Sequence, residues 1–219
     1  MQSNSFVASQ HDRFLPTGAA AANMRLMLAA AEKIERSRLS AADWEAGALD
    51  LIADQGVAAV AVEPLARRLN VTKGSFYWHF ETREALLKAS LLRWETHADE
   101  ALDQLATIAN PRARLYELFR RAGREAKSQM IYAALMRAMD QPIVHAVMER
   151  VSQRRLEFLS KAYREVGMSA GNALHRAHLT YAAYVGFLQL ALQLGLPRLD
   201  HAELEAYVEH VMNTLIPAA

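Results

Sequence analysis

Apolar residues recur at helical spacing along the chain from about residue 40 to residue 215. The first inward-facing stripe contains Trp44, Ala48, Leu51, Ile52 and Gln55, and a later one contains Leu86, Leu87, Leu91 and Trp94. Because positions three and four apart share one face of a helix, these stripes predict amphipathic α-helices. No stretch of useful length alternates apolar and polar residues as a half-buried strand does. We therefore predict an all-α protein.

Capping residues and breaks divide this pattern into segments. Ser40 followed by Asp43 is close to a capping box and opens the first helix, which Gly56 ends. Further helices are predicted over residues 62–69, 73–80 and 82–107 and, beyond the Asn110-Pro111 break, over 111–128, 130–140, 142–166, 169–194 and 200–215. Residues 1–23 lack periodicity and predict an unstructured segment, whereas residues 24–38 have helical spacing.

The segment from Asn70 to Phe80 predicts a tight turn followed by a short helix with two unlike faces. Phe76 and Phe80 share the face expected to enter a core, and Thr72 is a natural N-cap. The opposite face carries Gly74, Ser75, Trp78 and His79, flanked by Lys73 and Tyr77. Such side chains suit a DNA groove and its phosphates, and helix, turn and helix in this order predict a helix-turn-helix. Core packing of Trp78 and simple solvent exposure of His79 are the alternatives.

The distribution of charge favours the same segment. The formal net charge is only +1, but residues 62–93 hold six Lys or Arg and three Glu, whereas residues 41–61 hold four acids and no base. An ordinary mixed-charge surface is the alternative explanation. The absence of cysteine excludes disulfides, thiolate zinc sites and Cys nucleophiles and fits a reducing cytosol, so we expect a cytoplasmic protein. We see no signal peptide, and the uncharged stretch 179–197 favours a buried helix over a membrane span.

These residues resemble the TetR family of transcriptional regulators. The resemblance covers Ser40 to about Trp94. It rests on the Gly56 turn, on Leu65-Ala66-Arg67-Arg68-Leu69-Asn70-Val71, on Lys73-Gly74-Ser75-Phe76-Tyr77-Trp78-His79-Phe80, and on Arg83-Glu84-Ala85-Leu86-Leu87. It implies an N-terminal extension over residues 1–39, a helix-turn-helix DNA-binding domain over 40–93, and a helical ligand-binding and dimerisation domain over 94–219.

The resemblance also implies how DNA is contacted. Lys73, Gly74, Ser75, Trp78 and His79 approach the major groove, and Thr72, Lys73, Tyr77 and Arg83 contact phosphates. In some family members basic residues ahead of the first helix reach the minor groove, and Arg36 and Arg38 are placed to do so. Two positions depart from the family pattern: Ala61 stands where a capping Thr is usual, and Glu63 lies near the DNA side. Both departures leave open a helical dimer whose DNA-binding head has degenerated and which binds a ligand or a protein.

The body of the chain predicts a dimer interface and a ligand pocket. Residues 169–194 carry one apolar stripe of Leu179, Ala183, Gly186, Leu190 and Leu194 and another of Tyr181, Val185, Leu188 and Leu192, so this helix and residues 200–215 are the expected homodimer interface. A surplus of large adaptable side chains predicts a pocket for a small apolar or aromatic effector, with Phe119, Met130, Met136, Tyr181 and Tyr184 as candidate contacts, although an ordinary core uses the same residues. By the resemblance, the effector moves the 82–107 helix and releases a palindromic operator.

Enzymatic chemistry is the alternative from a different class. His175 and His178 lie three residues apart and, with His145, raise the possibility of a metal site. No carboxylate completes a recognisable motif, and phosphate-binding, dinucleotide-binding and nucleophile-elbow motifs are absent from the sequence. We therefore predict no catalytic residues, no metal and no cofactor.

Overall fold

The computed structural model of the chain describes residues 22, 39–122, 124–197 and 199–216. The chain divides between Leu39 and Ser40 into two units, and the second unit is described below. The expectations for residues 1–38, including those for Arg36 and Arg38, lie outside the described residues. Within the described residues the elements are helices, without strands, which confirms the all-α prediction.

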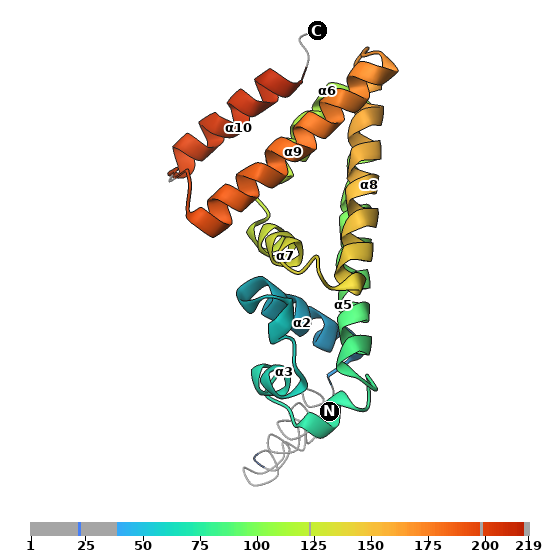
Figure 1. Cartoon of the computed structure of the whole chain (residues 1–219), viewed down its shortest axis with the longest axis vertical. Coiled ribbons are helices and arrows are strands. Elements are labelled where there is room, and N and C mark those ends of the chain that lie inside the picture. Colours follow the sequence, from blue (N-terminus) through green and yellow to red (C-terminus); the bar gives the residue numbers. More distant parts are fainter. Residues whose placement is uncertain (1–21, 23–38, 123, 198, 217–219) are drawn as a thin grey trace, which may run out of the picture. The chain divides into compact units, whose positions relative to one another are not determined.

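The helices follow one another with short connections (Figure 1). They are α2 (Ala41–Gln55), a 3-10 turn η1 (Val57–Ala59), α3 (Val62–Arg68), α4 (Lys73–Phe76), α5 (Arg83–Ala106), α6 (Pro111–Ala122), α7 (Ala126–Met136), α8 (Pro142–Glu165), α9 (Ala170–Leu194) and α10 (His201–Leu215). In the part of the chain that the structure describes, no helix combines the length and apolar character needed to cross a membrane.

Side-chain caps explain where several helices begin. The Ser40 hydroxyl accepts from the Asp43 amide and the Asp43 carboxylate accepts from the Ser40 amide, so the expected capping box is present at α2. Thr82 caps α5 by accepting from the Ala85 amide at 3.0 Å. Ala61, in contrast, stands at the start of α3 without a side-chain cap.

Three predicted helices and one predicted inward-facing residue differ from the structure. The helix predicted over 130–140 begins and ends four residues earlier, as α7. The segment 111–128 is split, because α6 ends at Ala122 and α7 already begins at Ala126, with the poor helix former Gly123 between them in sequence. The helix expected over 73–80 is regular only to Phe76, although the His79 and Phe80 amides still donate to the Phe76 carbonyl. Gln55, expected on the inner face of α2, is exposed, since it lies in the last turn beside Gly56.

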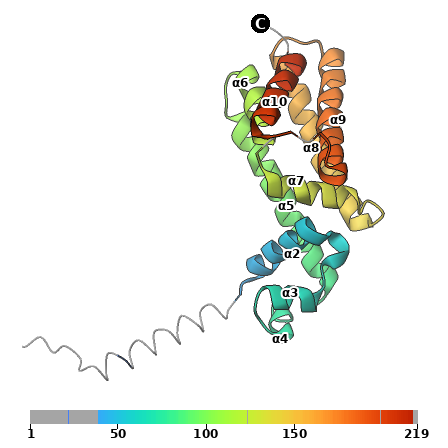
Figure 2. The same ribbon diagram turned by 90° about the vertical axis from the view of Figure 1, so that its left-hand side faces the viewer.

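Helices α2, α3 and α4 lie together in the ribbon (Figure 2). Buried aromatic and aliphatic side chains fill the space between them. Trp44 and Phe76 meet edge to face with ring centroids 5.4 Å apart, and both side chains are fully buried. Leu65 and Leu69 reach Gly47 so closely that a Cβ there would lie 3.1 Å from each, which shows how tightly α3 packs on α2. The sequence pattern therefore becomes a small core that supports the turn and α4.

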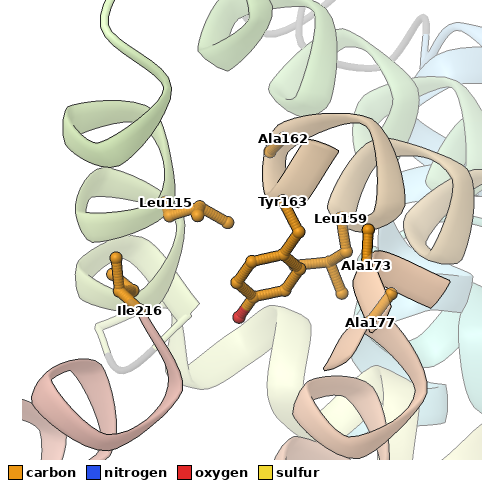
Figure 3. Close-up of a cluster of buried hydrophobic side chains, with 7 residues drawn as sticks. All are labelled: Leu115, Leu159, Ala162, Tyr163, Ala173, Ala177 and Ile216. Carbon is orange, nitrogen blue, oxygen red and sulfur yellow. The ribbon is translucent and has the colours of Figure 1, made fainter. Parts of the chain in front are cut away.

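A second core lies among α6, α8, α9 and the end of α10. Tyr163 of α8 is fully buried, and its hydroxyl hydrogen bonds the Thr180 hydroxyl of α9 at 2.7 Å. Figure 3 shows the surrounding cluster, which consists of Leu115, Leu159, Ala162, Tyr163, Ala173, Ala177 and Ile216. Glu95 of α5 binds Arg150 of α8 through two hydrogen bonds of 2.6 Å, so the long helix α5 is held to the body by an ion pair as well.

Candidate nucleic-acid interface and internal cavity

The segment that begins with α4 presents a strongly exposed aromatic surface. Trp78 is 88% exposed and Tyr77 is 56% exposed, whereas the neighbouring Phe76 is fully buried in the core. Thr72, Lys73, Gly74 and His79 are also exposed, and Ser75 is half-buried. Core packing of Trp78 is therefore ruled out. Burial of Phe76 and Phe80 fixes which side of this segment faces outward.

The turn ahead of α4 is fixed by backbone hydrogen bonds. Asn70 has φ of 55°, a left-handed conformation that Asn tolerates better than most residues. Its amide donates to the Arg67 carbonyl, and the Val71 amide donates to the Ala66 carbonyl at 3.0 Å. These two bonds form a Schellman motif, which ends α3 and turns the chain toward α4.

Two residues near the start of α4 have side-chain positions that the fold does not use for a cap or for packing. Thr72 stands at the N-cap position with extended backbone angles, but its hydroxyl makes no capping hydrogen bond. A Cβ added to Gly74 would meet only the Thr72 hydroxyl, at 3.7 Å, so the fold does not require glycine there. An open glycine surface allows another backbone to approach closely, which is what contact with a nucleic acid needs.

Lys73 is held by an acidic neighbour from the preceding helix. Its Nζ donates to Glu63 Oε1 at 3.1 Å, and both side chains are more than half exposed. This hydrogen bond, together with the carboxylate charge, raises the pKa of Lys73 above its ordinary value. The Glu63 carboxylate is therefore paired with Lys73 and is not an unpaired acid.

Arg83 takes part in contacts inside the molecule. Its Nε donates to the Val60 carbonyl and its Nη2 donates to the Val57 carbonyl at 3.2 Å. The guanidinium therefore joins the start of α5 to the η1 turn ahead of α3. Sequence spacing gave no sign of these acceptors, and the phosphate contact expected of Arg83 stays a prediction.

A cavity of about 650 Å³ that is partly open to solvent lies between α2, α5, α6, α7, α8 and α9. Phe119, Tyr181 and Tyr184 line it, as the ligand prediction requires. Met130 and Met136 are not among its lining residues, because Met130 is turned outward and is 37% exposed, while Met136 lies at the far end of α7. Cavities of this size hold small organic ligands.

Hydroxyl groups at one side of the cavity form a short network. The Tyr181 hydroxyl lies 2.8 Å from the Tyr132 hydroxyl and 3.0 Å from the Ser152 hydroxyl. Burial raises the pKa of Tyr132, and burial also raises the pKa of Tyr184. Both phenols therefore stay protonated and neutral at physiological pH.

Sequence reasoning missed a basic residue that lines the cavity without an acidic partner among the described residues. Arg155 of α8 lines the cavity, and its guanidinium carbon lies 4.9 Å from the centroid of the Tyr132 ring. In the sequence it is the second of two adjacent arginines on a charged helix, so no local signal separates it from its exposed neighbour Arg154.

Helix α9 presents an apolar stripe to solvent in the monomer. Every member of the first predicted stripe is exposed, and the largest exposed fractions are 65% for Leu194 and 56% for Leu179. In the second stripe Leu188 is buried and Tyr181 and Val185 are half-buried, but Leu192 is exposed. The two faces of α9 are therefore divided much as the sequence predicts, apart from Leu192.

The described residues bring no three His, Cys, Asp or Glu side chains close enough to hold a metal ion. This search included His145, His175 and His178, each of which is exposed.

The helices α2, α3 and α4, with a buried support and an exposed reading surface, define a helix-turn-helix protein. Residues 46–90 match the family model described as "Bacterial regulatory proteins, tetR family". Over these residues the chain is similar to the TetR family of transcriptional regulators. No curated protein matches the sequence.

Solved structures share the fold over most of the chain. A transcriptional regulator from Rhodococcus sp. Rha1 is 20% identical with a TM-score of 0.65, over 81% of this chain and 96% of that one. A TetR transcriptional regulator from Legionella pneumophila is 17% identical with a TM-score of 0.67, over 78% and 95%. The reduced form of NemR from E. coli is 21% identical with a TM-score of 0.65, over 82% and 98%. At these identities the likeness is one of fold.

Proposed function

We propose that this regulator is a ligand-responsive repressor that binds a palindromic operator as a homodimer. The observation that carries the proposal is the exposed Trp78, which stands beside Lys73 and His79 on a turn anchored by the fully buried Phe76. A large aromatic side chain left in water is costly to keep unless another surface covers it. We assign DNA binding to residues 40–93, ligand binding and dimerisation to residues 94–219, and an accessory role to residues 1–39.

The DNA contacts divide by chemistry. Trp78 and His79 are suited to base edges, since His donates to guanine and the indole packs on a thymine methyl or a sugar. Lys73, Tyr77 and Thr72 are suited to phosphates, and Gly74 and Ser75 allow the backbone to come near. Because one short helix reads few base pairs, two copies related by a two-fold axis are needed for a specific site.

Fluorescence anisotropy with a random-sequence duplex over a salt series tests the phosphate contacts. Lys73→Ala is expected to flatten the slope of log affinity against log salt by about one. Lys161→Ala is the matched control, because Lys161 is an exposed lysine of α8 in the body and should leave the slope unchanged. Equal slopes for all three proteins would favour a helical dimer with an inactive head and would overturn the proposal.

The homodimer is proposed from the exposed stripe of α9. Leu179, Leu190 and Leu194 are each about half exposed or more, and Ala183 and Gly186 between them allow a second helix to approach closely. Leu190→Glu is expected to convert a dimer into a monomer in light scattering coupled to size-exclusion chromatography. Leu92→Glu, at a leucine of α5 that is 57% exposed, is the matched control. A concentration-independent monomer mass for the unsubstituted protein would contradict the dimer.

The ligand response is proposed because the body contains a cavity and because α5 forms part of its wall. Trp94, Leu102 and Leu105 of α5 line it, and α5 follows the DNA-binding helices in the chain. A compound bound there would therefore touch α5, the helix that follows the reading surface in the chain. DNA affinity would change by the difference in the compound's affinity for the two states. A broad screen in which no compound shifts melting temperature or DNA affinity would remove this part.

A further inference from the structure

The cavity contains one basic group whose charge is not balanced. The Nη1 atom of Arg155 is buried and has no hydrogen-bond partner among the described residues. An orphaned donor in a protein interior carries a desolvation cost, and it is greater when the group is charged. Such a group marks a place where a partner is expected.

The other Lys and Arg residues around the cavity have acidic partners. Arg93 pairs with Glu45, Arg121 pairs with Glu117, and Lys127 pairs with Asp50. Within residues 39–122, 124–197 and 199–216, no carboxylate lies within 4.0 Å of the Arg155 guanidinium. The one acid that lines the cavity, Glu125, is exposed at the start of α7.

Arg155 lies over the ring of Tyr132, and this contact leaves guanidinium N–H groups without a hydrogen-bond acceptor. The guanidinium carbon lies 4.9 Å from the ring centroid, a cation–π geometry. All five N–H groups of a guanidinium point outward in its plane, where they match the two oxygens of a carboxylate. Tyr132 is a neutral phenol, so it orients the cation without neutralising it.

The remaining wall suits an apolar body attached to that anion. Trp94, Leu102, Leu105, Phe119 and Phe158 line the cavity, while the Tyr181 hydroxyl, already bonded to Tyr132 and Ser152, adds a neutral polar group. We propose that the cavity takes an organic carboxylate with an apolar or aromatic body, and that the Arg155 guanidinium binds the carboxylate. This inference rests on the proposed ligand response and specifies the chemical class of the effector.

Calorimetry with matched acids and amides tests the proposal. The probes are naphthalene-2-carboxylate and its carboxamide, and 6-phenylhexanoate and its amide, added to the full chain. The unsubstituted protein is expected to bind at least one acid about tenfold or more tightly than its amide. Arg155→Met is expected to lower the affinity for that acid by about ten- to a hundredfold and to leave the amide unchanged. Arg154→Met, at the exposed neighbour paired with Asp103, is expected to change neither.

Three results would overturn the inference: no binding of either acid, amides that bind as tightly as acids, or an Arg155→Met protein that keeps the acid preference. Arg155→Lys retains the positive charge without the planar guanidinium and is expected to keep a reduced preference for the acid over the amide. This variant replaces Arg155→Met in the test if the Met variant does not fold. DNA anisotropy with and without the bound acid separates the two proposals. If an acid binds in an Arg155-dependent way and leaves DNA affinity unchanged, the proposed ligand response is contradicted. If the acid and its amide both release DNA, the proposed carboxylate class of the effector is contradicted.

Discussion

The surface around α4 and the cavity each present a basic side chain beside an aromatic one. The two basic groups, Lys73 and Arg155, differ in whether an acidic partner balances the charge. The exposed Lys73 donates a hydrogen bond to Glu63 at 3.1 Å, whereas the buried Nη1 of Arg155 has no hydrogen-bond partner in the described structure. An exposed ion pair is weak and screened by salt, so it exchanges readily for a phosphate. Arg155 is half-buried, and its buried, unpaired Nη1 atom instead favours one specific anion.

This difference separates two kinds of recognition. At the surface, affinity for a polyanion depends on salt because counterions are released, and many weak contacts add together. In the cavity, one desolvated cation discriminates an anion from a neutral compound of the same shape. The four substitutions below test the comparison, from the largest expected effect to the smallest.

Phe76→Ala should have the largest effect, because it removes the buried support beneath the exposed surface. Phe76 is fully buried against Trp44, and such truncations cost about 3–5 kcal/mol of the free energy of unfolding. We expect lower stability in urea unfolding together with loss of DNA binding. Leu92→Ala, at an exposed leucine, is the control and should change neither. Unchanged DNA binding by Phe76→Ala would mean that this surface is not the reading surface.

Trp78→Ala should separate function from stability. Because Trp78 is 88% exposed, the free energy of unfolding should change by no more than about 0.5 kcal/mol. Affinity for a specific duplex should fall by about 1–3 kcal/mol if the indole contacts a base or sugar. Urea unfolding and anisotropy of one preparation measure both quantities. A stability loss as large as that of Phe76→Ala would show that Trp78 acts as a packing residue instead.

Arg155→Met should leave the ligand-free protein as stable as before or stabilise it by up to about 1 kcal/mol. The substitution relieves the unsatisfied buried donor and gives up the stacking on Tyr132, so the two effects largely cancel. Thermal unfolding without added compounds measures this. A clear loss of stability would show that the arginine belongs to the fold and would weaken the contrast with Lys73.

Glu63→Gln should have the smallest effect and should go in the opposite direction, toward tighter DNA binding. It removes the carboxylate that engages Lys73, so the lysine is free for a phosphate and a repulsive charge is lost. We expect less than about a tenfold gain in affinity for a random duplex. Glu149→Gln, at an exposed glutamate of α8, serves as the control. Weaker binding by Glu63→Gln would indicate that Glu63 positions Lys73 for DNA.

Most of the helices could be predicted from sequence, since their signals are local. The Ser40–Asp43 box, the Thr82 cap and the left-handed Asn70 each depend on residues within four positions of one another. The outward direction of Trp78 follows in the same way from its spacing to Phe76 and Phe80.

The contacts that could not be predicted join residues far apart in the chain. Glu63 meets Lys73 across two helices, Arg83 bonds carbonyls more than twenty residues away, and Arg155 faces a cavity built from six helices. In α7 the run from Ile131 to Leu135 is buried on every side, so the pattern could not tell which methionines face the cavity. Helix periodicity predicts which residues share a face, whereas tertiary packing determines which distant residues that face contacts.

Selection of bound duplexes from a random-sequence library by the purified full chain tests the central claim most directly. The account predicts enrichment of one motif with two-fold symmetry, and loss of that enrichment when Lys73 and Trp78 are both replaced by Ala. Enrichment of no sequence, or of the same motif by the doubly substituted protein, would contradict the assignment of this surface to DNA reading.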